Sequence, residues 1–125
     1  MVIVDTSVWI EFFKNKEPYF SELSKLLENN KVLATECIFA ELLQGANSKS
    51  ETNIINEFWT NLPKYPEENI FIKAGEESNR SNWINKGIGL IDSTIIILAR
   101  ETGSMIWSLD KKINSVLKSG EIYKI

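Results

Sequence analysis

Short aliphatic runs alternate along the chain with longer segments in which apolar residues recur every three or four positions. VIVD at 2–5, KVLAT at 31–35 and SMIWSL at 104–109 are mainly apolar runs bounded by polar residues. Near-continuous apolarity is typical of a strand that is covered on both faces of a sheet. We therefore predict parallel strands at these places, and a further short strand in EIYKI at 121–125.

The segments between these runs have the spacing of amphipathic helices. Leu23, Leu26 and Leu27, for instance, would share one face of a helix. The spacing predicts helices directly after Asp5, where Thr6 or Ser7 would provide the cap, and over 18–29, 36–46, 50–61, 67–86, 90–102 and 111–117. The proline-containing segment NLPKYPEEN at 61–69 is expected to be a turn or a short edge strand.

Strands that alternate with helices predict an α/β fold. The arrangement we expect is a three-layer α/β/α sandwich with a central parallel sheet of four to five short strands, in a single domain over residues 1–125. In such sheets, ligands bind beyond the carboxyl ends of the strands. Asp5 and Asp110 each follow a predicted strand, so both acids are expected at that edge.

The composition restricts the chemistry more than the fold. The chain has no histidine and a single cysteine, which excludes an imidazole base, a Ser-His-Asp or Cys-His nucleophile and a zinc site of the His/Cys type. Carboxylates, hydroxyls and lysines remain, and oxygen ligands suit Mg²⁺ or Mn²⁺. The formal net charge of −3 argues against a general nucleic-acid coat protein, but not against an acid-lined metal site.

No basic leader precedes an apolar run, and no apolar stretch approaches the length of a bilayer span. We therefore expect a cytoplasmic protein with no membrane partner. The lone cysteine, Cys37, agrees with this expectation, because it cannot form a disulfide within the chain.

Four acids are candidates for a site. Asp5, Asp92 and Asp110 each stand where a helix is predicted to begin, and for each alone an N-cap is the simpler interpretation, less so for Asp5, because Thr6 or Ser7 can cap in its place. Glu41 lies in the helical stretch CIFAELLQGA, where an ordinary solvated glutamate is the simpler interpretation. Glu36 is a rival for the same role.

The combination of these residues resembles a known family. DTSVWI, ELLQG, GLIDSTI and SLD are similar, in order and spacing over essentially the whole chain, to the PIN domain, and particularly to the VapC-type toxins of toxin–antitoxin pairs. The resemblance implies an acidic cluster that binds Mg²⁺ or Mn²⁺, formed by Asp5, Glu41, Asp92 and Asp110. It also implies hydroxyls that support the acids or the water, at Thr6, Ser7 and Ser108.

The chain departs from the family pattern at one place. Many members follow the last acid with a second aspartate and a phenylalanine, where this chain has Lys112 and Ile113. Asp110 itself stays in register. The loop after it therefore offers no auxiliary acid ligand.

The resemblance implies a metal-dependent endoribonuclease, in which a cation-activated water cleaves RNA phosphodiester bonds. It further implies inhibition by a cognate VapB-like antitoxin and a homodimer. Lysines near the acids are candidate contacts to RNA phosphates, although a solvated surface charge is the simpler interpretation of each. They are Lys14, Lys16, Lys111 and Lys112.

Two other classes of function remain open from the sequence. A receiver-like phosphoacceptor domain is also small, α/β and acid-lined, but it generally needs an adjacent acidic pair where this chain has only DTS. A related phosphatase of the haloacid-dehalogenase type needs an aspartate where Ser7 stands. A non-catalytic binding module would use the acids only as helix caps.

Overall fold

A two-stranded parallel sheet lies at the centre of the computed structural model, which describes residues 1–125. Strand β1 (Val2–Val4) pairs with β2 (Met105–Trp107), and Val4 lies opposite Trp107. The two strands come from opposite ends of the sequence. Their pairing brings the residues that follow each strand to the same edge of the sheet.

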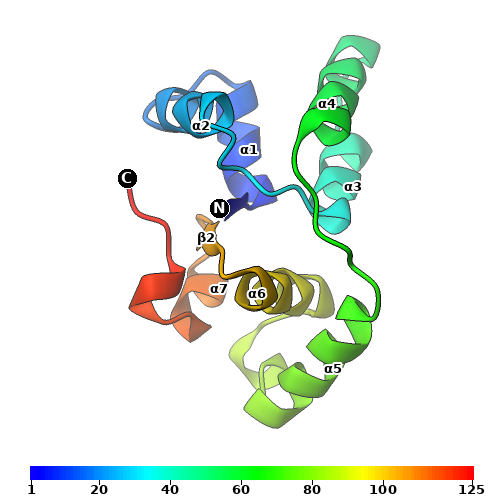
Figure 1. The fold of residues 1–125 in the computed structure, drawn as a ribbon, viewed down its shortest axis with the longest axis vertical. Coiled ribbons are helices and arrows are strands. Elements are labelled where there is room, and N and C mark those ends of the chain that lie inside the picture. Colours follow the sequence, from blue (N-terminus) through cyan, green and yellow to red (C-terminus); the bar gives the residue numbers. More distant parts are fainter.

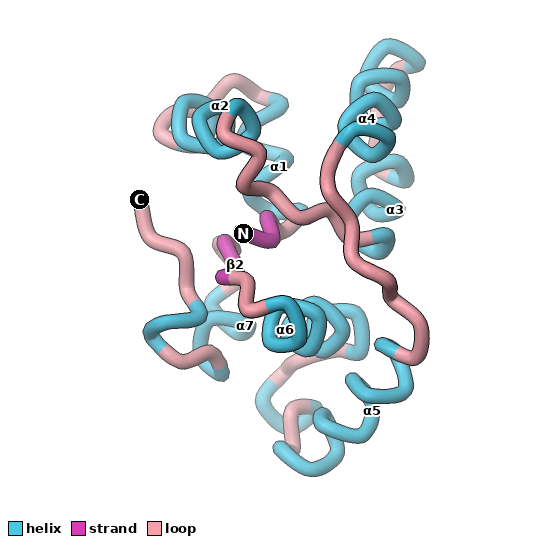
Figure 2. Tube along the Cα trace, in the orientation of Figure 1, coloured by secondary structure: helices cyan, strands magenta, loops and turns pink.

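Helices cover this sheet on two sides. Figures 1 and 2 show α1 to α4 on one side of the strands and α5 to α7 on the other. The helical elements are α1 (Thr6–Phe13), α2 (Tyr19–Glu28), α3 (Glu36–Gln44), α4 (Lys49–Asn61), α5 (Ile70–Ser81), η1 (Ile84–Lys86), α6 (Leu90–Thr102), α7 (Lys111–Val116) and η2 (Ser119–Glu121). The predicted α/β class with a parallel sheet is confirmed.

The predicted number of strands, four to five, is wrong. Outside β1 and β2 the sheet continues only as isolated parallel bridges, which join Val2 to Val32, Ala34 to Lys64, and Ile106 to Ile122. The segments 31–35 and 121–125 therefore lie where strands were expected, but each pairs too briefly to form one.

Local chemistry explains why these segments stay short. Asn30 adopts a left-handed conformation with φ of 54°, and α3 already begins at Glu36, which leaves few extended residues between them. Pro63, beside the bridge at Lys64, has no N–H to contribute to a ladder. The 3-10 turn η2 replaces the first part of the predicted terminal strand.

The helix predicted over 67–86 is interrupted for a similar reason. Asn69 (φ 64°) and Asn82 (φ 56°) are left-handed residues at the two ends of α5, a conformation that asparagine tolerates better than most residues. The last residues of the predicted helix form the separate 3-10 helix η1 instead. By contrast, α6 occupies residues 90–102 as predicted, and Ile95, Ile96 and Leu98 in its middle are buried.

Helix α1 is fixed in place by an aromatic cluster. Trp9, which is 1% exposed, packs against Phe12, Phe39 and Phe58 with ring centroids 5.3–5.6 Å apart. These contacts join α1 to α3 and α4. Because aromatic pairs add to the stability that burial alone gives, the first turn of α1 has a well-defined position relative to α3.

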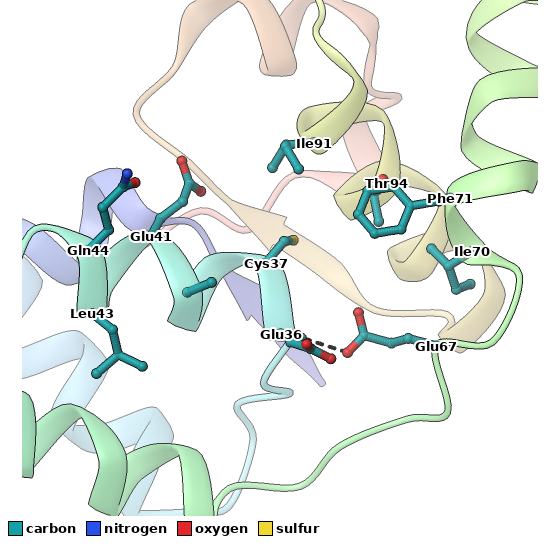
Figure 3. A pocket seen from close by; sticks show the side chains of 11 residues that line it. Glu36, Cys37, Glu41, Leu43, Gln44, Glu67, Ile70, Phe71, Ile91 and Thr94 are labelled. Carbon is teal, nitrogen blue, oxygen red and sulfur yellow. Dashed lines mark hydrogen bonds between the residues drawn. The ribbon is translucent and has the colours of Figure 1, made fainter.

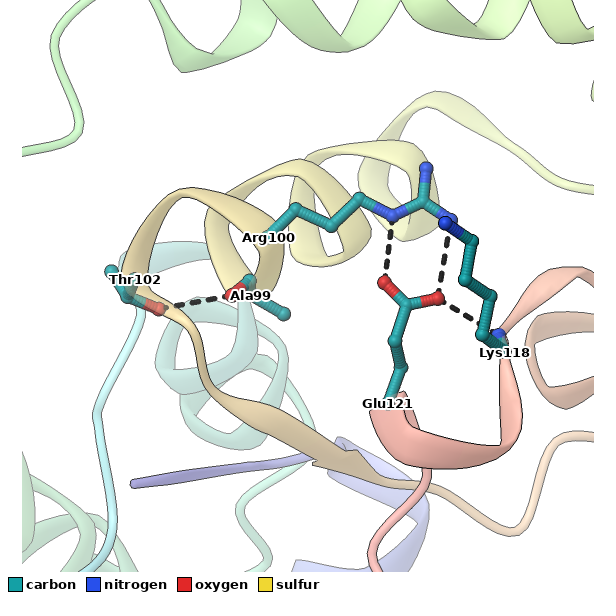
Figure 4. Close-up of polar contacts among 5 residues, drawn as sticks. All are labelled: Ala99, Arg100, Thr102, Lys118 and Glu121. Carbon is teal, nitrogen blue, oxygen red and sulfur yellow. Dashed lines mark hydrogen bonds and ion pairs between the residues drawn. The ribbon is translucent and has the colours of Figure 1, made fainter.

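The end of α6 that lies farthest from the acids is tied to the C-terminal segment. Arg100 donates to both carboxylate oxygens of Glu121, through Nε at 2.8 Å and a terminal nitrogen at 3.3 Å, and the Lys118 amide donates to the same carboxylate (Figure 4). None of the helices combines the length and apolarity needed to cross a membrane.

Candidate functional site

Asp5 lies at the carboxyl edge of the sheet, directly after β1. Its backbone N–H donates to the carbonyl of Trp107, 2.9 Å away, so its position is fixed by the β1–β2 pairing. The side chain is 8% exposed. Although Asp5 is the N-cap residue of α1, its carboxylate makes no capping bond, and the interpretation of Asp5 as a simple cap is wrong.

Two serine hydroxyls orient the Asp5 carboxylate instead. Ser7 Oγ and Ser108 Oγ each donate to Asp5 Oδ2 at 2.8 Å. Each hydroxyl oxygen also accepts a backbone N–H, from Leu109 at 3.1 Å and from Asp110 at 3.0 Å. Since a hydroxyl carries one proton, these amides direct both protons to Oδ2. No group of the chain donates to Oδ1.

Glu41 reaches the same region from α3. Thr6 Oγ1 donates to Glu41 Oε1 at 3.1 Å. Thr6 and Ser7 were expected to provide a cap for α1, and that expectation is wrong because both hydroxyls are used on acids. The residues after Asp5 therefore serve to orient two carboxylates from different elements.

The other two aspartates differ in their local roles. Asp92 lies in the first turn of α6, whose N-cap is Gly89, so Asp92 is not a cap. Asp110 is the N-cap of α7, and its Oδ1 accepts the N–H of Lys112 at 2.8 Å. The capping interpretation is thus confirmed for Asp110 and wrong for Asp92.

Electrostatics link the four acids. Burial raises the pKa of Asp92 to about 6, and the negative charges of Asp5, Asp110 and Glu41 add to this effect, while Lys112 opposes it. Like charges raise the pKa of a carboxyl group only over short distances. We call Asp5, Glu41, Asp92 and Asp110 the acid cluster; the rival Glu36 is not one of the charges to which the shift of the Asp92 pKa is traced.

The acid cluster suits a hydrated divalent ion better than a fully enclosed one. No three His, Cys, Asp or Glu side chains lie close enough to enclose an ion directly. Mg²⁺ usually keeps several of its waters and binds one or two carboxylates. The repulsion that raises the pKa of Asp92 is also relieved by a bound cation. The residues present therefore fit Mg²⁺ or Mn²⁺.

A groove of about 900 Å³ opens beside Glu41, between α3, α5 and the start of α6 (Figure 3). Apolar side chains, including Leu43, Ile70, Phe71 and Ile91, form much of its wall. Its charged residues are all acidic, at Glu36, Glu41 and Glu67. The groove is therefore both apolar and negatively charged, and it is continuous with the acid cluster through Glu41.

Glu67 belongs to the wall of this groove and was not predicted as a functional residue. Burial raises its pKa, although the Glu36 N–H, which donates to Glu67 Oε2 at 3.1 Å, opposes that shift. Glu67 lies where the expected turn or edge strand at 61–69 overlaps the helix predicted over 67–86, and neither expectation gave it a functional role. No pattern in the sequence indicates that it faces α3.

The four candidate lysines do not share one position. Lys14 lines a smaller cavity of about 240 Å³ together with Thr6 and Glu41. Lys111 and Lys112 begin α7 directly after Asp110. Lys16 forms an ion pair with Glu11, 3.5 Å away, and no contact brings it to the acid cluster.

Asn114 supports the site and was missed in the sequence. Its Nδ2 donates to the carbonyl of Ser108 at 3.0 Å, while its Oδ1 is buried without a partner. Asn114 therefore holds the loop whose serine hydroxyl orients Asp5. Its spacing, one helical turn after Asp110, was the only available signal, and that spacing is common to many helices.

Comparisons with known proteins show which family the sequence matches. A family model of the PIN domain matches residues 2–118. Over 119 residues, which are 92% of this chain and 89% of that protein, the chain is 25% identical to Ribonuclease VapC32 of Mycobacterium tuberculosis strain CDC 1551 / Oshkosh. The identity and coverage are the same for Ribonuclease VapC32 of strain ATCC 25618 / H37Rv.

Proposed function

The chain belongs to the PIN-domain family, and on that premise we propose that it is a VapC-like endoribonuclease dependent on Mg²⁺ or Mn²⁺. The observation that carries the proposal is the acid cluster, in which the charges of Asp5, Glu41 and Asp110 all act on Asp92. The name of the relatives, Ribonuclease VapC32, supports the same reaction. Asp5, Glu41, Asp92 and Asp110 would hold the ion.

When bound, such an ion lowers the pKa of a coordinated water and offsets charge on the phosphodiester. The residues of the chain prepare the site for it. Ser7 and Ser108 hold Asp5 Oδ2, which leaves Oδ1 for the ion or its waters. Thr6 holds Glu41 in the same way. Because these contacts lie within the chain itself, they would orient both carboxylates without the help of a ligand.

Lysines beside the acid cluster would bind the RNA backbone. Lys111 and Lys112 follow Asp110, and Lys14 shares a cavity with Glu41, so each lies near one member of the acid cluster. Contacts to phosphates position a strand without reading its sequence. Lys16 contributes less in this proposal, because it is already paired with Glu11.

The groove beside Glu41 would receive the inhibitory segment of a VapB-like antitoxin. Its apolar wall fits the apolar face of a peptide, and its three glutamates, with no lysine or arginine among the lining residues, favour basic side chains on that peptide. A peptide in this groove would cover Glu41 and so interfere with both the ion and the RNA.

A second copy of the chain is proposed as a further partner. Several large apolar side chains remain in contact with solvent on α5, η1 and α6, among them Ile72 at 66% and Ile84 at 79% exposure. Burial of such residues in a homodimer would remove them from water. Light scattering on the purified chain would measure the mass directly.

Cleavage of a labelled RNA with and without Mg²⁺ tests the proposed reaction. Asp5→Asn and Glu41→Gln should each abolish Mg²⁺-dependent cleavage while the chain still unfolds cooperatively. Glu36→Gln is the matched control, because Glu36 is a glutamate of the same helix whose carboxylate receives no hydrogen bond from Thr6, unlike that of Glu41. Retained cleavage in Asp5→Asn, or equal losses in both glutamate variants, would contradict the assignment.

A further inference from the structure

A cavity of about 240 Å³ lies between α1, α3 and the start of α4. Thr6 and Glu41 form part of its wall, and Thr6 Oγ1 donates to Glu41 Oε1 at 3.1 Å. We call this space the Lys14 cavity, after the lysine that also lines it. Because Glu41 belongs to the acid cluster as well, an occupant of the Lys14 cavity would lie directly beside that cluster.

The Lys14 cavity differs in charge from the groove and from a third cavity near Asn30 and Asn61. Those two have no lysine or arginine among their lining residues, whereas the Lys14 cavity has one cation and two acids, Glu41 and Glu51. Lys14 forms no ion pair with either acid. Both kinds of charge therefore remain available to a ligand that carries an anionic group and N–H donors.

The Glu51 carboxylate is only loosely held by the chain. Glu51 lies in the first turn of α4, and its backbone N–H donates to the N-cap hydroxyl of Ser48 at 3.1 Å, which leaves the side chain free. Its Oε2 lies 3.5 Å from the backbone nitrogen of Asn47, at the outer limit of a hydrogen bond, and no group of the chain donates to Oε1. Because Asn47 also lines the cavity, this carboxylate can accept bonds from an occupant.

The apolar part of the wall includes an aromatic ring. Phe13 lines the cavity together with Ile10, which is 44% exposed. Phe13 stacks on Trp9 with ring centroids 5.7 Å apart and an interplanar angle of 25°, so the aromatic cluster holds it in place. A rigid aromatic side chain beside open space is the kind of surface on which proteins stack unpaired bases.

We propose that the Lys14 cavity binds one unpaired base of the RNA, beside the phosphodiester that is cleaved, and that Glu51 makes guanine the preferred base. This inference rests on the proposed nuclease function and adds a choice of base to it. The Watson–Crick edge of guanine has two adjacent N–H donors, at N1 and N2, and the two oxygens of a carboxylate can accept both. The other three bases place a carbonyl or a ring nitrogen acceptor next to their donor, and such an acceptor repels a carboxylate.

Fluorescence anisotropy in EDTA measures the base preference without cleavage. The probes are labelled oligouridylates whose central base is uracil, guanine or hypoxanthine. The wild type should bind the guanine probe about tenfold more tightly than the uracil probe, as expected for one bidentate pair. Hypoxanthine lacks the amino group at C2 and should lose most of this gain. Equal affinities for the guanine and uracil probes would overturn the proposal.

Glu51→Gln should bind the guanine and uracil probes alike, because its amide has one acceptor oxygen in place of two. Glutamine is tolerated as well as glutamate at this position of a helix, so Tm should stay close to that of the wild type. Glu57→Gln is the matched control, since it removes the same charge from the same helix, but Glu57 does not line the Lys14 cavity. This control should keep the preference for guanine.

Lys14→Met distinguishes contact with the phosphate from contact with the base. A phosphate contact carries no sequence information, so this variant should weaken the binding of the guanine and uracil probes by a similar factor. A selective loss of guanine binding in Lys14→Met, with the preference intact in Glu51→Gln, would overturn the assignment of base recognition to Glu51.

The outcomes separate the two proposals. A preference for guanine that persists in Glu51→Gln, or that Glu57→Gln loses equally, would overturn the role of Glu51 and leave the nuclease proposal intact. With Mg²⁺ and RNA of mixed sequence, the mapped ends should place guanosine at one fixed position beside the cut, and no fixed position would overturn the proposed place of the base. A wild type that prefers guanine in EDTA but cleaves no RNA with Mg²⁺ would contradict the nuclease proposal and leave the guanine site.

Discussion

The acidic residues at the two ends of α6 have opposite electrostatic surroundings. At the N-terminal end, Asp92 faces three other carboxylates, and its pKa is raised to about 6. At the C-terminal end, Glu121 is paired with Arg100, and this contact holds the pKa of Glu121 below its usual range. One end is electrostatically satisfied within the chain. The other keeps carboxylates that raise one another's pKa, and it is the place where we propose that a cation binds.

This difference separates stability from function along a single helix. A paired charge such as the Arg100–Glu121 contact contributes modestly to folding. A group of unpaired acids at a buried edge works against folding, and such groups occur preferentially at functional sites. Variants at the two ends of α6 should therefore affect different measurements.

Asp92→Asn should have the largest effect and should sharpen the contrast. Loss of one acid should reduce Mg²⁺-dependent RNA cleavage by about a hundredfold or more. The same variant should raise Tm in EDTA, because it removes a charge that the other carboxylates repel. Cleavage assays and thermal unfolding of the same preparation check both results. A lower Tm in EDTA would contradict the repulsion that we infer at this end.

Asn114→Ala should have an intermediate effect on both measurements. The Ser108 loop would lose the hydrogen bond from Nδ2, so Ser108 would hold Asp5 less firmly. We expect about a tenfold loss of cleavage, as for other residues that orient a metal ligand, and a loss of about 1 kcal/mol in the free energy of unfolding. Ser115→Ala, at the next residue of α7, is a suitable control. Full activity in Asn114→Ala would show that the loop holds its position without the asparagine.

Arg100→Met should change stability alone. Loss of the bonds to Glu121 should lower the free energy of unfolding by about 1 kcal/mol, and denaturant titration measures this. RNA cleavage should stay at the wild-type rate, because the change lies at the far end of α6 from Asp92. A clear loss of cleavage in a folded Arg100→Met variant would remove the distinction between the two ends.

The pH dependence of stability should show the smallest effect. Because the pKa of Asp92 is raised from 3.8 to about 6, its contribution to stability is fully present below pH 3.8 and is lost as pH rises through about 6. After allowance for solvent screening, the difference is about 1 kcal/mol. The Tm advantage of Asp92→Asn over the wild type in EDTA should therefore be largest at neutral pH and should shrink on acidification. A difference that does not vary with pH would contradict the shift.

The sequence predicted some of these features better than others. The residues of β1 and the position of α6 follow from strong local patterns, a short apolar run before Asp5 and a long one after Gly89. The segments 31–35 and 121–125 have similar local patterns, but their pairing is limited by a left-handed Asn30 and by η2. The periodicity of a segment does not show how many of its residues can form hydrogen bonds with a neighbouring strand.

The same limit applies to the prediction of the site from the sequence. The acids could be identified by residue type and order, but their supporting contacts join residues far apart in the chain. Ser108 reaches Asp5 only because β1 and β2 pair. Interpretation of Thr6 and Ser7 as helix caps was reasonable locally and wrong, because the fold provides acids as closer partners.

Anomalous diffraction from crystals grown with MnCl₂ tests the central claim most directly, because it locates the ion itself. We predict a manganese peak at the carboxyl edge of β1, in contact with Asp5 and with at least one of Glu41, Asp92 and Asp110 or their bound waters. A peak held instead by Glu36 and Glu67, or no ordered manganese near Asp5, would contradict the account.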